Sequence, residues 1–385
     1  MDHSDDHLET LRREITAFCG QFPQEYWLGL ESEQAYPTAF VEAMTAQGWL
    51  AALIPPEYGG AGLGLVEAGV ILEEVNRSGG NASACHAQMY TMGVLLRHGS
   101  PALKESVLPA LAKGELRLQA FAITEPDAGS DTTRISTRAV RLGDRYVLSG
   151  RKVFISRVEF SDLMLVLARS DPPGAGRDRT AGLTLFLVDL KTAGPRIHWE
   201  RIPVMFNLHT YEVTFDGLEL SDDCVVGRPG EGFRYVIDGW NAERILLASE
   251  AVGDGRYFVE KASAYASSRT VFGRPIGANQ GVQFPIAEAH ADVEAASLMR
   301  FHAAGLFDQG RRCGSEANMA KLLASKASWK AGNAALTAMG GYGFAREYHV
   351  ERKFRETKLF EIAPVSNNLI LAYLGQHALG MPKSY

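Results

Sequence analysis

The chain has 385 residues, of which 46% are hydrophobic and 22% are charged, and its formal net charge is −6. This length is enough for two or three domains with substantial cores, and the composition is typical of a globular protein. The negative net charge excludes the general basic surface that holds nucleic acid or an anionic membrane.

The N-terminal residues and the cysteines bear on where the protein works. The first seven residues, Met-Asp-His-Ser-Asp-Asp-His, are acidic and no apolar core follows them, so we do not expect a signal peptide. No apolar run approaches the ~20 residues that a membrane-spanning helix needs. The cysteines form neither a CxxC pair nor a metal-ligand spacing, which favours reduced thiols and no metal site: Cys19, Cys85, Cys224 and Cys313. These features predict a cytoplasmic location.

Residues 1 to about 118 are expected to form helices. A clear helix is predicted from 63 to 77, because apolar residues recur there with a period near 3.6: Leu65, Ala68, Gly69, Leu72 and Val75. A second helix is predicted from 103 to 111. We therefore expect an N-terminal helical domain.

Residues from about 119 to 228 have the pattern of strands and turns. Short runs of apolar and β-branched residues predict strands at 146–148, 163–168, 183–188, 212–215 and 225–226. The segment 171–176, Asp-Pro-Pro-Gly-Ala-Gly, is predicted to be a loop. This middle region should therefore be a small β domain.

From about 229 onward the helical pattern returns. Long amphipathic helices are predicted at 233–251, 287–307 and 317–338. Long helices that pack antiparallel form a bundle. The order of helices, β domain and bundle differs from the strand and helix alternation of a doubly wound nucleotide-binding fold.

Several common motifs are excluded. The glycines at 60, 62 and 64 do not have the GxGxxG spacing, and Pro55 and Pro56 argue against a strand before them, so a turn before a helix is expected. The chain contains no P-loop, HExxH or GxSxG motif. Metal-dependent hydrolysis and a serine triad are therefore not supported.

Two segments at the start of the β region have the chemistry of a cofactor contact. Residues 122–131, Ala-Ile-Thr-Glu-Pro-Asp-Ala-Gly-Ser-Asp, form a turn-rich loop with hydroxyls and exposed backbone that can approach a flat ring. Residues 150–156, Gly-Arg-Lys-Val-Phe-Ile-Ser, offer the aromatic face of Phe154 and the hydroxyl of Ser156. For the second segment alone, the alternative is an ordinary strand with Phe154 pointing inward.

Two more segments lie in the C-terminal helical region. Residues 269–273, Arg-Thr-Val-Phe-Gly, are followed by Gln280, and residues 340–344 read Gly-Gly-Tyr-Gly-Phe. An arginine suits a pyrophosphate because its guanidinium is always charged and bonds two oxygens at once. Paired glycines let the backbone approach a ligand closely.

In this order and at these separations, the four segments resemble the signatures of the acyl-CoA dehydrogenase family. Weaker similarities at 55–60, 72–75 and 108–115 extend the resemblance over nearly the whole chain. The resemblance implies an α+β fold with an N-terminal helical domain (1–118), a small middle β-barrel or sandwich domain (119–228) and a C-terminal four-helix bundle (229–385).

The resemblance also implies FAD as the cofactor. The implied contact residues are Ile123, Thr124, Gly129, Ser130, Phe154, Ser156, Arg269, Phe272, Gln280, Gly340, Gly341, Ser366 and Asn368. In the family, the counterparts of Arg269, Phe272 and Gln280 reach the FAD of a neighbouring subunit, so a homo-oligomer is implied, usually a tetramer built as a dimer of dimers. Among these signatures the chain departs from the family pattern in three ways: Arg134 replaces a small residue, Phe154 to Ser156 replace Trp-Ile-Thr, and Thr337 replaces a glutamine.

The family's reaction removes a proton from the α-carbon and a hydride from the β-carbon of an acyl thioester. A carboxylate is a sensible base, since burial beside a flavin raises its pKa towards neutrality. In many relatives the base is a glutamate in a C-terminal Tyr-Glu-Gly-Thr motif, but Pro364 stands at that position here. Isovaleryl-type and long-chain-type relatives instead carry a Glu-Arg pair on a long helix, where this chain has Glu243 and Arg244.

The resemblance therefore implies Glu243 as the catalytic base, with Arg244, Asn241 and Ser130 as substrate contacts. Glu361 lies near Pro364 and is a rival base, and a solvated carboxylate is the alternative for Glu243. Proline also removes a backbone N–H that, in the family, helps to polarise the thioester carbonyl. Either Val365 supplies the donor or the thioester sits differently.

The leading interpretation is an acyl-CoA dehydrogenase of fatty acid β-oxidation that passes electrons to an electron-transfer flavoprotein. One alternative is a flavin-dependent oxidase or monooxygenase on the same fold, which air would reoxidise rapidly. Another is a non-catalytic FAD-binding relative, whose flavin no thioester would reduce. The acyl chain length, and the choice between coenzyme A and a carrier protein, stay open.

Overall fold

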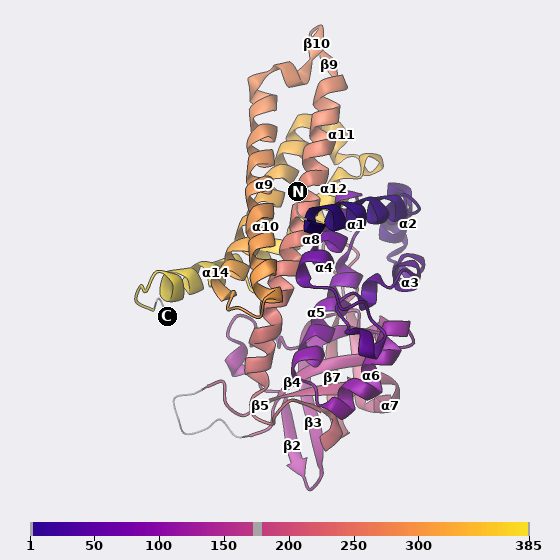
Figure 1. Ribbon diagram of the computed structural model, residues 1–385, viewed down its shortest axis with the longest axis vertical. Coiled ribbons are helices and arrows are strands. Elements are labelled where there is room, and N and C mark those ends of the chain that lie inside the picture. The colour runs from indigo at the N-terminus through magenta and orange to yellow at the C-terminus, as the bar shows by residue number, and fades with distance from the viewer. Residues whose placement is uncertain (1–2, 172–178, 384–385) are drawn as a thin grey trace. The chain divides into compact units, whose positions relative to one another are not determined.

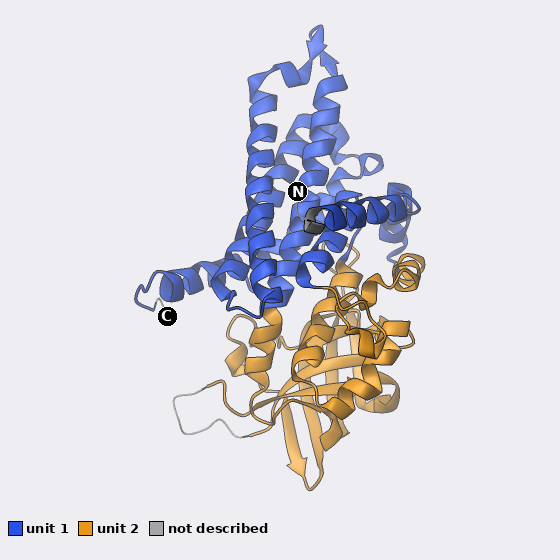
Figure 2. Cartoon of the chain, viewed as in Figure 1, with its two compact units in different colours: residues 1–35, 64–82, 241–385 blue, residues 36–63, 83–240 orange. Residues whose placement is uncertain are grey.

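The computed structural model describes residues 3–171 and 179–383 of the chain (Figure 1). Figure 2 shows its two compact units: unit 1 comprises residues 1–35, 64–82 and 241–385, and unit 2 comprises residues 36–63 and 83–240. Each unit thus combines segments that are distant in the sequence. The loop predicted at 171–176 lies outside the described residues except for Asp171.

Unit 1 is built from helices. The early ones are α1 (His3–Cys19), α2 (Gln24–Glu33) and α4 (Leu65–Arg77). The long ones are α8 (Gly232–Ser268), which belongs to this unit from Asn241 on, α9 (Gln280–Asp308) and α10 (Gly314–Met339). The hairpin of β9 (Thr270–Val271) and β10 (Arg274–Pro275) joins α8 to α9. The short helices are α11 (Gly341–Phe344), α12 (Val350–Thr357), α13 (Leu359–Ile362) and α14 (Asn367–Tyr373).

The long helices of unit 1 approach one another closely. Helices α9 and α10 pack side by side over much of their length (Figure 1). On α8, a Cβ at Gly255 would lie only 2.5 Å from a methyl carbon of Val293 on α9. The glycine therefore permits a backbone approach that a larger residue would prevent.

Unit 2 joins a mixed sheet to the first part of α8 (232–240) and to the helices α3 (Thr38–Ala46), α5 (Ser83–His98), α6 (Pro101–Lys113) and α7 (Leu190–Ala193). The strands are β1 (Leu118–Ala122), β2 (Arg138–Leu142), β3 (Arg145–Ser156), β4 (Leu163–Arg169), β5 (Leu183–Asp189), β6 (Ile197–Ile202), β7 (Thr210–Ser221) and β8 (Val225–Val226). Their order is β6-β7-β3-β2-β4-β5-β8, and β1 pairs with β4 in parallel.

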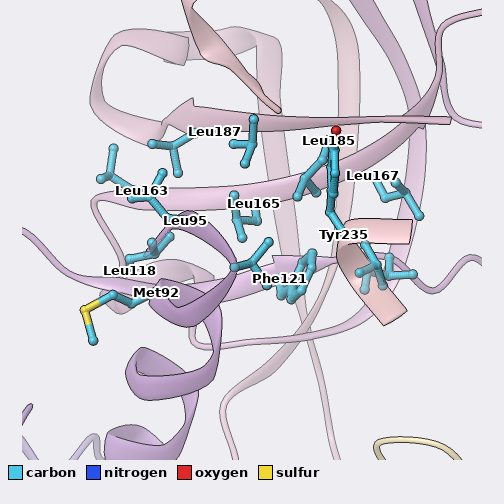
Figure 3. Packing of buried hydrophobic residues seen from close by; sticks show 14 of the residues in the cluster. Met92, Leu95, Leu118, Phe121, Leu163, Leu165, Leu167, Leu185, Leu187 and Tyr235 are labelled. Carbon is cyan, nitrogen blue, oxygen red and sulfur yellow. The ribbon is translucent and has the colours of Figure 1, made fainter. Parts of the chain in front are cut away.

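Strand β4 has a core on each face, because successive side chains point to opposite sides of a sheet. Leu163, Leu165 and Leu167 pack with Met92 and Leu95 of α5 in one hydrophobic cluster (Figure 3). The alternate residues Met164, Val166 and Ala168 belong to a second cluster. Burial on both faces explains why β4 is a continuous apolar run in the sequence.

A buried carboxylate organises the interior of unit 1. Glu73 on α4 is fully buried and forms ion pairs with three arginines, Arg12, Arg256 and Arg300. Nη1 of Arg12 lies 2.8 Å from Oε1 of Glu73. A buried charge needs this kind of compensation. The network links α4 to α1, α8 and α9.

The predicted elements agree with the structure. The helices predicted at 103–111, 233–251, 287–307 and 317–338 lie within α6, α8, α9 and α10, and the helix predicted at 63–77 corresponds to α4, which begins two residues later at Leu65. The predicted strands lie within β3, β4, β5, β7 and β8. The α+β fold class is therefore confirmed.

Candidate functional site

The loop after β1 is anchored in unit 2 by a buried ion pair. Oε1 of Glu125 accepts hydrogen bonds from Nζ of Lys152 at 3.0 Å and from the Thr137 N–H at 2.9 Å. Its Oε2 accepts from the N–H of Ser136 at 2.6 Å. Lys152 also donates to the carbonyl of Ile123 at 2.9 Å. Lys152 of strand β3 thus fixes the loop through its bonds to Ile123 and Glu125.

These contacts keep Glu125 ionised. Burial opposes the charge, but Lys152 and the hydrogen bonds from Ser136 and Thr137 outweigh it and lower the pKa of Glu125 to about 2. Burial lowers the pKa of Lys152 to about 8, although Glu125 acts in the opposite direction. The pair is a structural support, because its polar atoms point into the protein rather than to a ligand.

Next to this ion pair, strand β3 of unit 2 carries an exposed aromatic residue, Phe154. The Val153 N–H donates to the carbonyl of Thr124 at 2.9 Å, which joins β3 to the loop. The next residue, Phe154, has a φ of 60° and its side chain is 61% exposed. A bulky residue with positive φ is an unusual conformation that is often found at functional sites. Phe154 therefore does not point inward as in an ordinary strand.

The other predicted contacts on unit 2 lie near these residues in the chain. Gly129 and Ser130 are exposed on the loop, and a Cβ at Gly129 would meet nothing within 4 Å. The hydroxyl of Ser156 lies 3.3 Å from that of Thr210 on β7. Unit 2 thus offers an exposed aromatic ring, hydroxyls and open backbone.

On unit 1, α8 buries the two residues expected to act on substrate. Glu243 and Arg244 are each 7% exposed. Nη1 of Arg244 donates to Oδ1 of Asn241 at 2.9 Å, while its Nε has no acceptor among the described residues. Burial lowers the pKa of Arg244 to about 10, although the Glu243 carboxylate acts in the opposite direction. The structure thus brings Asn241, Glu243 and Arg244 together on one helix.

The segment 363–368 of unit 1 turns sharply before α14. Pro364 is followed by Val365, which has a φ of 66°. The hydroxyl of Ser366 accepts from the Leu369 N–H at 3.4 Å and so caps α14, while Asn368 is exposed. Glu361, the rival base, is paired with Lys358 at 2.5 Å.

A pocket of about 530 Å³ lies on unit 1 at the ends of α8 and α10. It is lined by Arg269 and by the backbone of Gly340 and Gly341, so it unites two predicted motifs that are distant in the sequence. A Cβ at either glycine would meet nothing within 4 Å, which leaves open space above the backbone. Its volume is in the range of ligand pockets. Thr337 and Tyr342 also line it.

Of the residues predicted together with Arg269, Phe272 and Gln280 lie outside this pocket. Phe272 is fully exposed on the β9–β10 hairpin with a φ of 52°. Gln280 is exposed at the start of α9. Both residues are therefore open to solvent on the single chain.

Sequence reasoning missed the supporting residues. Lys152 and Glu125 both lie in recognised segments, but their pairing could be inferred only from the sheet register. Lys321, which contacts the segment 363–368, looks in sequence like one more lysine on a helix. In sequence, Tyr342 is only one residue of a glycine motif, whereas in the structure its ring lies 5.7 Å from the Arg269 guanidinium.

Models of the acyl-CoA dehydrogenase family match the chain in three parts. The N-terminal domain model matches residues 5–115, the middle domain model residues 120–218, and the C-terminal domain model residues 230–378. Among curated proteins, the acyl-CoA dehydrogenase FadE12 of Mycobacterium tuberculosis is 34% identical over 384 residues, covering 98% of this chain and 97% of that protein.

Solved structures with a similar fold include members of the same family. Glutaryl-coenzyme A dehydrogenase in its glutaryl-CoA complex aligns with a TM-score of 0.91 and 30% identity, covering 98% of this chain and 96% of that chain. The FAD complex of PigA aligns with a TM-score of 0.90 and 26% identity, covering 99% and 98%. The chain belongs to the acyl-CoA dehydrogenase family and is an oxidoreductase.

The described residues contain neither a candidate metal site nor a candidate membrane-spanning helix. No group of three or more His, Cys, Asp and Glu side chains in that part of the chain is placed to hold a metal ion. None of its helices is long and apolar enough to cross a membrane.

Proposed function

We propose that the protein binds FAD and oxidises an acyl-CoA thioester to the trans-2-enoyl-CoA, with Glu243 as the base. The observation that carries this proposal is the burial of Glu243 beside Arg244 in a chain whose C-terminal glutamate position holds Pro364. The glutaryl-CoA complex of a relative with 30% identity supports an acyl-CoA substrate.

The residues present fit FAD. The pocket on unit 1 combines the Arg269 guanidinium with two glycines that leave space for a ligand, which suits a pyrophosphate and a nucleoside. On unit 2, the exposed ring of Phe154 and the loop around Thr124 suit a flat ring system. FAD, when bound, supplies flavin N5 as the acceptor of the β-hydride. Further proposed contacts are Ile123, Gly129, Ser130, Ser156, Phe272, Gln280, Ser366 and Asn368.

The chain's own residues supply the acid-base chemistry. The Glu243 carboxylate takes the α-proton of the thioester. Arg244, whose Nε has no acceptor among the described residues, is free to donate a hydrogen bond to the substrate. The Val365 N–H, which donates to no backbone carbonyl in the described chain, replaces the donor lost at Pro364. A donor to the developing enolate is worth ~3 kcal/mol.

The electron acceptor and the assembly follow from the same family resemblance. We propose an electron-transfer flavoprotein as the acceptor and a homotetramer, a dimer of dimers, as the assembly. The exposed Phe272 supports the second point, because it is placed on a projecting hairpin rather than in the pocket of its own unit.

The test is an anaerobic titration of the purified protein with saturated acyl-CoAs, from short to long and including branched chains, while the visible flavin band is recorded. Bleaching by one size class in the wild type, and its loss in Glu243→Gln, is the expected result. Glu361→Gln is the matched control, since it alters a carboxylate that is already paired with Lys358. It should bleach like the wild type.

Other outcomes point to other functions. A yellow protein that no thioester bleaches contradicts the dehydrogenase proposal and favours a non-catalytic FAD-binding protein. Bleaching followed by rapid recovery in air favours an oxidase. Bleaching that persists in Glu243→Gln but is lost in Glu361→Gln would move the base to Glu361.

A further inference from the structure

Lys321 is a buried lysine whose ammonium group is hydrogen-bonded to the turn at 364–367. It stands on α10, is fully buried, and its Nζ donates to the carbonyl of Val365 at 2.9 Å and to Oδ1 of Asn367 at 3.0 Å. Burying an ammonium is costly unless it is hydrogen-bonded. These two bonds satisfy it and tie α10 to the turn.

Asn367 is held by a second group one helical turn further along α10. Nδ2 of Asn367 donates to Oγ of Ser325 at 3.1 Å. Lys321 and Ser325 are four residues apart and therefore share one face of the helix. Together with Asn367, these two residues form a three-residue clamp on the turn.

The clamp acts on a backbone that needs support. Val365 has a φ of 66°, a conformation that a β-branched residue adopts only under constraint from its surroundings. The carbonyl of this same residue receives the Lys321 hydrogen bond. A fixed carbonyl fixes the plane of the peptide between Val365 and Ser366. The Val365 N–H lies in the preceding peptide, and its direction relative to the fixed plane depends on the backbone angles of Val365, whose φ is 66°.

Lys321 is also coupled to the proposed catalytic residues. Its charge interacts with Arg244 and Glu243 on α8 and with Glu361 on α13. Burial and then the Arg244 charge lower the pKa of Lys321 to about 7, while Glu361 and Glu243 act in the opposite direction. The charge of Lys321 in the clamp therefore interacts with the charge of the proposed base, Glu243, within unit 1.

We propose that Lys321 is a positioning residue for the reaction: it fixes the turn at 364–367 and so aims the Val365 N–H at the substrate carbonyl beside Glu243. This inference rests on the proposed function. It assigns to Lys321 no contact with substrate or cofactor.

The experiment compares Lys321→Met and Asn367→Ala with the wild type and with Lys326→Met, which alters an exposed lysine of the same helix. Amide hydrogen exchange of a peptide covering 364–369 reports on the turn without requiring activity. Stopped-flow reduction by the thioester found to bleach the protein reports on the chemistry. Far-UV circular dichroism and Tm confirm that each variant is folded.

We expect exchange in this peptide to be about 10-fold faster or more in both clamp variants. We expect reduction at saturating thioester to be about 10- to 100-fold slower, with a smaller change in thioester affinity, since a misplaced donor affects mainly the transition state. The double variant should be little worse than Lys321→Met, because the two residues act as one unit. Lys326→Met should match the wild type.

Wild-type exchange in both clamp variants would overturn the inference. So would wild-type reduction rates despite faster exchange, which would leave Lys321 a purely structural role. If Lys321→Met does not fold, Asn367→Ala decides, because it removes one of the two acceptors of Lys321 and leaves the lysine in place. If no thioester reduces the wild type, the proposed function fails and the aim at a substrate carbonyl fails with it, while the exchange result still decides whether the clamp holds the turn.

Discussion

Nζ of Lys152 lies 3.0 Å from Oε1 of Glu125, and the two side chains are 0% and 4% exposed. The pair fastens the loop that begins at Ile123 to strand β3, directly before the exposed Phe154. The loop and the ring are the parts of unit 2 that we assign to the flavin. The pair therefore determines whether both are held in place.

Lys152→Met should destabilise the protein by about 3–5 kcal/mol, because it leaves the Glu125 carboxylate buried without its cation. Chemical denaturation measures this change. Lys191→Met is the control, since Lys191 pairs with Asp162 at 2.7 Å but is 71% exposed, and should cost less than ~1 kcal/mol. Equal losses in the two variants would contradict the structural role of the buried pair.

Acid should remove the contribution of Glu125. Its pKa is lowered from 4.5 to about 2 in the folded state, so its stabilising effect is present above pH 4.5 and is lost as the pH falls through 2. The difference in unfolding free energy between the wild type and Glu125→Gln should therefore narrow as the pH falls from 4.5 towards 2. Urea unfolding at a series of pH values checks this. A difference independent of pH would show that the charge of Glu125 does not matter.

Glu73→Gln should destabilise unit 1 by about 3–5 kcal/mol. The substitution keeps the shape of the side chain but leaves Arg300, which is fully buried, without its counter-charge. Glu294→Gln is the matched control, because Glu294 pairs with Arg256 at 3.0 Å but is 44% exposed. Thermal unfolding of the two variants should differ by several degrees.

Arg269→Ala should weaken FAD binding by about 10- to 100-fold, the value of one or two charge-assisted hydrogen bonds. The readout is flavin fluorescence on reconstitution of the apoprotein with FAD. Arg274→Ala is the control on the same hairpin, since Nη2 of Arg274 donates to Oδ1 of Asn279 at 2.8 Å and Arg274 does not line the pocket. Equal FAD affinities for the wild type and Arg269→Ala would show that the pocket is not part of the cofactor site.

Much of the fold could be predicted because its signals are local. The period of apolar residues places α8, and the continuous apolar run places β4. The family resemblance implied FAD contacts at Arg269 and Gly340, and both residues line one pocket in the structure.

The supporting contacts could not be predicted in this way. Lys321 and Asn367 are 46 residues apart, and Glu73 and Arg300 are 227 apart. Such pairs depend on how helices pack, and each residue by itself resembles a solvated charge. The catalytic role proposed for Glu243 rests on family resemblance, because a glutamate on a helix carries no local sign of burial.

The divided sequence of unit 1 has a consequence for how the protein is made. Unit 2 ends at residue 240, whereas unit 1 takes its last segment from 241–385. A chain emerging from the ribosome therefore exposes Glu73 on α4 well before Arg256 and Arg300 exist to neutralise it. Domains generally fold as units during synthesis. Residues 1–35 and 64–82 of unit 1 therefore cannot complete their packing until 241–385 have been synthesised. We expect unit 1 to finish folding near the end of translation, after all residues of unit 2 have been made.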